Sequence, residues 1–318
     1  MRDLRWHAAI LALLALVSTA CSSRSSSIGD ARQHSPDVET TSLLGQPLSP
    51  GIPVAPAVAA ADSALAAAPD DPERLLAAAS ARAASWRFRE AVALYTRGME
   101  RWPQDWRFPR FRGHRYITLR KFPEAARDLD LAGRLDSTNF DVAYHQGLAH
   151  FLLGHHDRAA QVYGNCLAKA GNEALRAREA AGAYGAGYRS CMRNATDADS
   201  RVAMSDWAWR ALMHAGRRGD ADALLAGIGE GLAVSTNRSY YENLLLYKGL
   251  RTPEQVMTAA GSDSVRFSTS GYAVANWYLL RGDTARARDM FRRVARSPHW
   301  SGFGVIGAEV ELVRRKWQ

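Results

Sequence analysis

The sequence predicts an all-α solenoid built from helix hairpins. Pro69, Pro103 and Ser137 recur with a period of about 34 residues, and each is followed closely by an acidic residue or Asn. A fixed period of this length indicates a repeat architecture, in which each unit packs against its neighbours. Residues of the same class recur at the same positions of each period. No segment alternates apolar and polar residues with the β-branched enrichment of a strand, so we expect no sheet.

Three consecutive units, 72–105, 106–139 and 140–173, follow from this period. Two columns hold small residues and a third holds Tyr or Leu. The columns are Ala79, Gly113 and Gly147; Ala91, Ala125 and Ala159; and Tyr95, Leu129 and Tyr163. In these columns the chain resembles the tetratricopeptide repeat (TPR) family. The resemblance implies antiparallel helix pairs that approach closely at the small residues, with the bulky residue between neighbouring hairpins.

The segment 1–20 has the features of a secretory signal peptide. Arg2 and Arg5 precede the apolar run 8–17, which is too short to span a bilayer, and small residues lead to Cys21. The segment resembles a bacterial lipobox, which implies that Cys21 is acylated and becomes the mature N-terminus. Ser22 follows it where Asp would imply retention in the inner membrane, which favours the outer membrane. We expect residues 21–56, which are rich in Ser and Pro, to be the lipidated Cys and a flexible tether.

The rest of the chain divides into three helical segments. Residues 57–173 hold a partial leading repeat and three TPR units, and residues 174–267 hold degenerate helical repeats. The register returns in 268–318, where a C-terminal TPR unit precedes a last helix. Apolar residues at three- and four-residue spacing from Phe303 to Trp317 form one stripe on that helix, as expected for a capping helix.

The cysteines fit an exported protein. With Cys21 assigned to the lipid, Cys166 and Cys191 remain as a pair. In an oxidising periplasm this pair is a possible disulfide. The alternative is two buried thiols that act as small hydrophobic side chains.

The sequence contains no recognisable catalytic constellation, so we expect no enzyme activity and no cofactor. GFGVIG at 302–307 matches G-x-G-x-x-G, but the strand before it and the later acidic residue that dinucleotide binding requires are missing. The histidines His145, His150, His155 and His156 are spaced five, five and one residues apart. Ligands on one helical face need spacings of three or four, so we expect packed histidines and no metal site.

Residues 105–121, DWRFPRFRGHRYITLRK, form a basic and aromatic stretch in a chain of formal charge +9. Such a stretch is typical of nucleic-acid binding, but an exported protein rarely meets nucleic acid, and we expect none as a partner. The TPR resemblance implies a peptide-binding groove lined by the first helix of each unit. Its members here are Arg107, Arg110, His114, Thr118, Tyr144, Leu148 and Phe151. Such a groove suits a peptide with an acidic group or free C-terminal carboxylate; the alternative is an arginine face that is solvated or paired within the molecule.

The whole arrangement resembles the NlpI-type TPR lipoproteins of enteric bacteria. The resemblance implies a lipid-anchored scaffold in the bacterial cell envelope, facing the periplasm from the outer membrane and gathering envelope proteins such as cell-wall enzymes. The alternative is a permanent structural subunit or pilot lipoprotein of an outer-membrane assembly or secretion complex. We expect no small-molecule substrate in either case.

Overall fold

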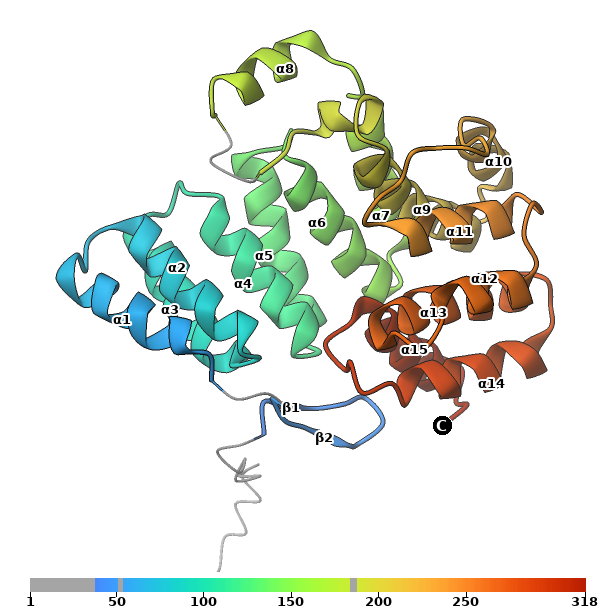
Figure 1. The fold of residues 1–318 in the computed structure, drawn as a ribbon, viewed down its shortest axis with the longest axis horizontal. Coiled ribbons are helices and arrows are strands. Elements are labelled where there is room, and N and C mark those ends of the chain that lie inside the picture. The colour runs from blue at the N-terminus through green and yellow to red at the C-terminus, as the bar shows by residue number, and fades with distance from the viewer. Residues whose placement is uncertain (1–37, 51–53, 184–187) are drawn as a thin grey trace, which may run out of the picture. The chain divides into compact units, whose positions relative to one another are not determined.

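Helices make up nearly all of the regular structure in the computed structural model, which describes residues 38–50, 54–183 and 188–318 (Figure 1). The first half of the array, as we name it, consists of α1 Pro56–Ala67, α2 Pro72–Ala84, α3 Phe88–Arg101, α4 Arg107–Thr118, α5 Phe122–Leu135, α6 Phe140–Leu153 and α7 His156–Leu167. A connecting segment follows with α8 Glu173–Ala180 and the 3-10 helix Cys191–Ala195. The second half consists of α9 Ala198–His214, α10 Arg218–Ala226, α11 Arg238–Tyr247, α12 Pro253–Ala260, α13 Ser264–Leu280, α14 Thr284–Ala295 and α15 Phe303–Arg314.

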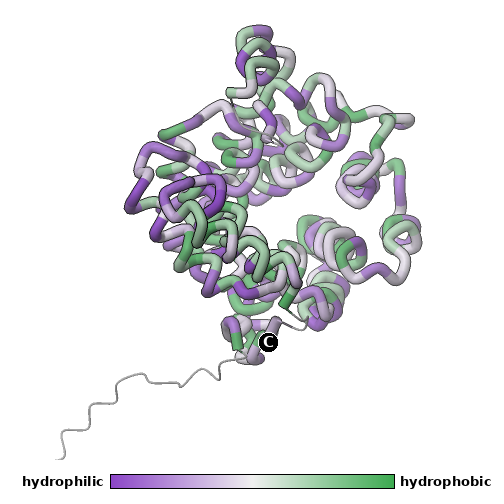
Figure 2. Tube along the Cα trace, turned by 60° about the vertical axis from the view of Figure 1, so that its left-hand side comes forward, coloured by the Kyte–Doolittle hydropathy of each residue, from purple (hydrophilic) through white to green (hydrophobic). Residues whose placement is uncertain are grey.

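The predicted fold class is confirmed: the first half is a TPR-type solenoid of antiparallel hairpins. Each predicted unit is one hairpin, α2–α3, α4–α5 and α6–α7, and each helix packs against the next along the chain. Apolar and polar residues are mixed along the helices (Figure 2). Helices such as α3 and α14 bury one face, whereas α6, α9 and α11 are buried on most sides. None of the helices in the described part of the chain is both long and apolar enough to cross a membrane.

The small-residue column marks the closest approaches between helices. A Cβ atom added at Gly113 would lie 2.6 Å from the Leu129 side chain, and one added at Gly147 would lie 2.4 Å from the Tyr163 ring. The close approach at the small-residue column agrees with the prediction. The bulky residues Leu129 and Tyr163 make these contacts within their own hairpins, however, where we expected them to lie between neighbouring hairpins. Glycine is therefore required at both positions by packing and not by backbone conformation.

The turn between the two helices of each unit uses a left-handed residue. Gly154 has φ 85° in the third unit, but the equivalent positions of the second and first units hold Arg120, with φ 62°, and Trp86, with φ 56°. A side chain in this conformation costs about 1 kcal/mol or more, so other contacts must hold it there. Arg120 and Trp86 both contact residues of the second half, as described below.

The second half also consists of hairpins, but they are less regular. The pairs α9–α10, α11–α12 and α13–α14 each pack together, and the terminal helix α15 packs against both α13 and α14. The predicted apolar stripe of α15 is buried at Ile306 and Val310, whereas Val313 is 36% exposed and Trp317 is half-buried. The two halves meet first where α7 packs against α9.

Two expectations about the segment before α1 need correction. Residues 40–41 and 47–48 pair as a short antiparallel hairpin, β1 Thr40–Thr41 and β2 Pro47–Leu48, where we expected no strand. The flexible tether therefore cannot extend to residue 56. The hairpin is held by helix ends: Glu39 accepts from the Arg89 N–H at 2.8 Å, and Thr40 donates to the Leu119 carbonyl at 3.1 Å. Such backbone and side-chain contacts are invisible to composition, which predicted disorder. The signal segment and Cys21 lie outside the described residues.

Candidate functional site: a basic cavity between the two halves

The predicted groove is not open along its length. Arg107 is paired within its own half, with Nη1 2.5 Å from Glu73 Oε1 and Nη2 2.6 Å from Asp105 Oδ2. These carboxylates raise the pKa of Arg107 above its usual value, with Asp105 contributing most. Arg107 therefore carries a compensated charge at the edge of the array.

Arg110 is buried, with 7% of its surface exposed. Its nearest acidic partner is Asp141 of α6, at 3.6 Å, and its guanidinium carbon lies 4.4 Å from the centre of the Phe111 ring. Burial lowers the pKa of Arg110, and the Asp141 charge opposes that shift. The structure therefore favours the alternative left open above for Arg107 and Arg110, in which the arginines pair within the molecule.

The other predicted groove residues face the second half of the protein. The Tyr144 hydroxyl lies 2.9 Å from the Tyr240 hydroxyl and accepts a hydrogen bond from Trp207 Nε1, also at 2.9 Å. Leu148 and Phe151 belong to the main apolar core, where Phe151 packs against Trp207. The sequence could not show this, because nothing in the repeat columns says which segment covers the concave side.

Polar contacts hold the terminal helix against the first half. Arg120 and Glu309 form a buried ion pair, with Nη2 2.6 Å from Oε1, and Arg120 also donates to the Trp300 carbonyl at 2.9 Å. Arg314 donates to the Leu152 carbonyl at 3.1 Å. Trp86, in the same turn column as Arg120, packs edge-on against Trp300 with ring centres 5.4 Å apart. Both side chains that replace glycine in this column therefore hold the C-terminal segment.

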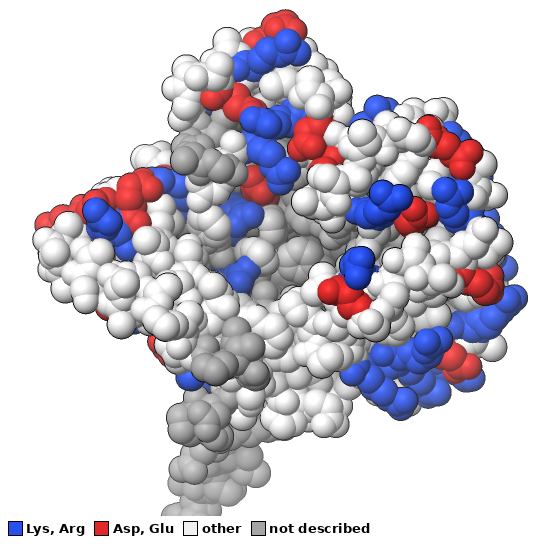
Figure 3. All heavy atoms as spheres, viewed as in Figure 1, with Lys and Arg blue, Asp and Glu red and all other residues white. Residues whose placement is uncertain are grey.

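A cavity of about 320 Å³ remains between the halves. It is bounded by the α2–α3 turn, α4, α9, the N-terminal part of α13, and the segment that leads into α15. Figure 3 shows the hollow in the middle of the molecule, with basic side chains on its wall. The side chains most important for its chemistry are His114, Arg115, Arg210, Tyr240, Thr269 and Phe303.

Arg115 gives the cavity an uncompensated positive charge. Its guanidinium carbon lies 5.1 Å from the centre of the Phe88 ring, and no acidic side chain in the described part of the chain is within ion-pair distance. The pKa of Arg115 is lowered to about 10, mainly by partial burial and with a smaller contribution from the nearby Arg110 charge. The group still carries its proton at neutral pH, so a half-buried cation without an ion-pair partner in the described part of the chain faces this cavity. Sequence reasoning missed Arg115, because the TPR groove positions do not include it.

Arg210 and His114 behave differently from Arg115. Arg210 is 1% exposed in its side chain, forms an ion pair with the equally buried Asp206, and stacks 4.0 Å from the Trp207 ring. Burial lowers the pKa of His114 well below its usual value, with smaller effects from Arg115 and His145. His114 is therefore neutral at pH 7, and Arg115 carries the unbalanced charge of this site.

The N-terminus of α15 adds hydrogen-bond donors. Gly302 is the N-cap and has no side chain to bond the first N–H groups of the helix, and Ser301, Gly302 and Gly304 line the cavity. Unsatisfied N–H groups at a helix N-terminus favour an anion. The glycines of GFGVIG have a packing role, since a Cβ at Gly304 would lie 2.2 Å from the Ser268 carbonyl oxygen. The motif is the N-cap and first turns of α15, and the element before it is the helix α14, where a dinucleotide fingerprint requires a strand.

The histidines of the third unit lie in small contacts with different partners, and His150 Nδ1 lies 3.4 Å from His155 Nδ1. His150 Nε2 lies 3.0 Å from Asp130, His145 Nδ1 lies 2.7 Å from the Asp141 carbonyl oxygen, and His156 stacks on His214 with ring centres 4.9 Å apart. Within the described ranges, no group of three or more His, Cys, Asp or Glu residues is placed to hold a metal ion.

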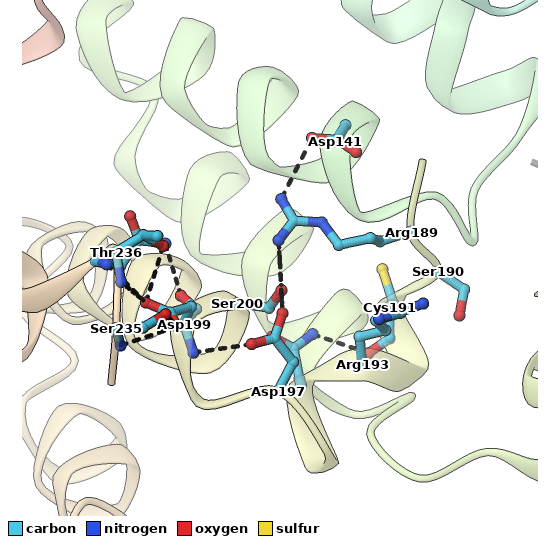
Figure 4. A network of polar contacts seen from close by, with 12 residues as sticks. Asp141, Arg189, Ser190, Cys191, Arg193, Asp197, Asp199, Ser200, Ser235 and Thr236 are labelled. Atoms are coloured by element: carbon cyan, nitrogen blue, oxygen red, sulfur yellow. Dashed lines mark hydrogen bonds and ion pairs between the residues drawn. The ribbon is translucent and has the colours of Figure 1, made fainter. Parts of the chain in front are cut away.

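A disulfide and a polar network fix the joint between the halves. In the structure Cys166 of α7 is bonded to Cys191 of the connecting segment. Figure 4 shows Arg189 near Cys191, where Arg189 links Asp141 at 3.7 Å to Asp197 at 3.5 Å. Asp199 accepts from the backbone N–H groups of residues 235, 236 and 237, which lowers its pKa to about 2. This network sets the position at which the second half begins.

Comparisons with known proteins give similarity at the level of structure only. No family model matches the chain, and no curated protein matches it. One similar solved structure is that of Naa15/Naa10 bound to HypK-THB, with 16% identity and a TM-score of 0.35, covering 79% of this chain and 36% of that chain. Another is the TPR domain of P58(IPK), with 15% identity and a TM-score of 0.29, covering 80% of this chain and 68% of that one. The chain thus spans about a third of the first of these structures.

Proposed function

We propose that the protein is a non-enzymatic adaptor that binds an acidic chain end of a partner protein in the cavity between its halves. The observation that carries the proposal is the unpaired charge of Arg115 beside the uncapped N-terminus of α15. A carboxylate entering the cavity would accept hydrogen bonds from both. A half-buried cation without a counter-ion is stabilised by an anionic partner, and a ligand carboxylate in the cavity would supply one.

The size of the cavity limits what can enter. About 320 Å³ is at the lower end of the volumes typical of ligand pockets. Because α15 closes the concave side, a long peptide cannot lie along the helices as it would in an open groove. A chain end with its carboxylate and one or two side chains fits, and the rings of Phe88, Trp207 and Phe303 would contact apolar side chains.

The place of this adaptor in the cell is also part of the proposal. The signal segment and Cys21 support a lipid anchor in the outer membrane facing the periplasm, and the Cys166–Cys191 disulfide suits an oxidising compartment. Envelope or cell-wall enzymes are then the partners that we propose. The second candidate remains a permanent subunit of an envelope complex, which recovery only in a stoichiometric, detergent-stable assembly would favour.

The binding test uses a library of C-terminal peptides, each prepared as the free acid and as the amide. Free acids should bind the full mature chain, and the amides should bind ~10-fold or more weakly, because charged hydrogen bonds are lost. Arg115→Gln should lose the preference for the acid, whereas the matched change at exposed Arg74 should not. Equal binding of acids and amides, or unchanged binding by Arg115→Gln, would refute the cavity as the binding site.

The partner is sought in crosslinked pull-downs from membranes with the native N-terminus, comparing wild type with Arg115→Gln. Arg115 is a better test than Arg110, because Arg110 is buried beside Asp141 and its replacement changes the core as well. Recovery of the same proteins from both chains would contradict the adaptor proposal at this site. Hydrolysis of peptidoglycan by the purified protein would overturn the non-enzymatic assignment.

A further inference from the structure

The outer face of α14 carries a concentration of arginine. Residues 281–296 contain six arginines and two aspartates, a net formal charge of +4. Ala287, Met290, Phe291 and Val294 are buried on the inner face of α14. At 100° per residue, the opposite face holds the four residues that we name the arginine face: Arg288, Arg292, Arg293 and Arg296. Figure 3 shows the basic cluster over this helix, at the lower right.

Little of this charge is neutralised by the protein. Arg288 has one acidic neighbour, Asp289, at 3.4 Å, and both side chains are exposed. Arg292 donates to the backbone carbonyl of Trp317 at 3.1 Å, and Arg293 lies over the Phe267 ring at 5.7 Å. Exposed pairs of the Arg288–Asp289 kind contribute little stability. The arginine face is therefore available to an external anionic surface.

The C-terminal turn extends the same surface with different chemistry. Arg292 reaches Trp317, and the residues around that tryptophan include Arg315, Lys316 and the 36%-exposed Val313. Arginine and lysine next to a partly exposed Trp and an apolar side chain is the composition found where a protein meets a membrane interface. A nucleic acid or an acidic protein would explain the arginines but not the exposed apolar residues.

We propose that the arginine face of α14, with the Trp317 turn beside it, docks on an anionic phospholipid surface. The lipid headgroup phosphates would pair with the arginines, and Trp317 and Val313 would enter the interfacial layer. The proposal rests on the proposed function only in that a lipid anchor would bring the protein to a membrane; contact with lipid depends on the arginine face itself. Docking would turn the cavity and its opening toward a fixed direction in the periplasm.

Vesicle binding by the full mature chain with Cys21→Ser tests the docking without any acyl group. We expect co-sedimentation with vesicles that contain phosphatidylglycerol, none with pure phosphatidylcholine, and loss of binding at high salt. The triple change Arg288→Gln, Arg293→Gln and Arg296→Gln should weaken binding ~100-fold, since each arginine near an anionic surface contributes about a fivefold factor. The matched control changes exposed Arg74, Arg101 and Arg176 to Gln, which removes the same charge from other faces.

Each outcome decides the docking proposal separately from the adaptor proposal. Equal losses in the two triple variants would show that net charge alone drives binding and would overturn the arginine face. Failure to bind any vesicle, or binding to an acidic polypeptide such as polyglutamate and not to vesicles, would overturn the membrane assignment. Arg115→Gln should bind vesicles like the wild type, because that residue lies in the cavity; a loss there would also contradict the proposal.

Discussion

The first half of the array is held together by local contacts between successive hairpins, whereas the second half is positioned by contacts that reach back across the chain. Gly147 meets Tyr163 within one hairpin, and Gly113 meets Leu129 in the same way one repeat earlier. Glu309 and Arg120 are 189 residues apart in the sequence, and their ion pair is a single contact that does not recur with the repeat period. Local, repeated packing leaves a pattern in the sequence, and a single long-range pair does not.

The largest expected effect concerns the buried pair that closes the two halves. Glu309→Gln leaves the Arg120 charge, 3% exposed in its side chain, without its carboxylate. We expect a loss of about 3–5 kcal/mol in the free energy of unfolding, measured in urea. Amide exchange should rise in α15 before it rises in α2–α5, because the closure opens while the repeats persist.

Two variants make this prediction specific. Glu100→Gln changes an exposed carboxylate of the first half and should cost less than ~0.5 kcal/mol. Arg120→Gly would relieve the left-handed backbone at residue 120, so it should stabilise the protein if only the turn mattered. We expect it to destabilise, since Glu309 is then buried unpaired. A loss under ~1 kcal/mol for Glu309→Gln would show that apolar contacts alone close the halves.

The same division separates what the sequence could and could not predict. The hairpins, their boundaries within a few residues and the close contacts at Gly113 and Gly147 follow from the repeat columns. The closing of the concave side by the second half does not follow from the repeat columns, because it depends on which distant side chains contact Tyr144 and Arg120. Arg115 supplies the unpaired charge of the candidate site. Nothing in the neighbouring sequence distinguishes it from Arg112, which pairs with Asp128 at 2.7 Å. The position of Asp128 on the paired helix α5 makes Arg112 structural and leaves Arg115 unpaired.

The next effect concerns the disulfide at the joint between the halves. Replacing Cys166 and Cys191 together by Ala removes a crosslink across 25 residues, for which the chain-entropy model gives a loss of about 3 kcal/mol. Amide hydrogen exchange should increase in the connecting segment around α8 and not within α2–α5. Alkylation of the denatured, unreduced chain should find neither cysteine reactive; two reactive thiols would show that the cysteines are packed without a bond.

A smaller effect tests the repeat columns of the first half. Gly147→Ala places a Cβ 2.4 Å from the Tyr163 ring, and we expect overpacking to cost about 1–3 kcal/mol in urea unfolding. Gly164→Ala, on the facing helix α7, meets no atom within 4 Å and should instead stabilise by ~0.5–1 kcal/mol. If both substitutions stabilise, the helices tolerate a wider spacing than the column implies.

The smallest expected change in the free energy of unfolding, per pH unit, comes from the histidines between the halves. Burial lowers the pKa of His145 well below its usual value and that of His156 to about 4, with His214 adding to the shift of His156. The unfolded chain therefore binds more protons than the folded one below about pH 6.5, and stability falls as the pH falls through that range. Each buried histidine contributes at most about 1.4 kcal/mol per pH unit, and partly exposed His156 less.

Substitution separates these histidines from the rest of the protein's acid response. His156→Gln should flatten the dependence of the unfolding free energy on pH between about 6.5 and 4, where wild-type His156 is protonated only in the unfolded chain. The neighbouring exposed His155→Gln is the control and should keep the wild-type slope. Because His156 of α7 stacks on His214 of α9, acid should weaken the contact between the halves before the hairpins themselves. If the unfolding free energies of the two variants depend equally on pH, groups other than His156 cause the acid sensitivity. If amide hydrogen exchange rises at the same pH in α2–α5 and α9–α15, the two halves unfold as one unit.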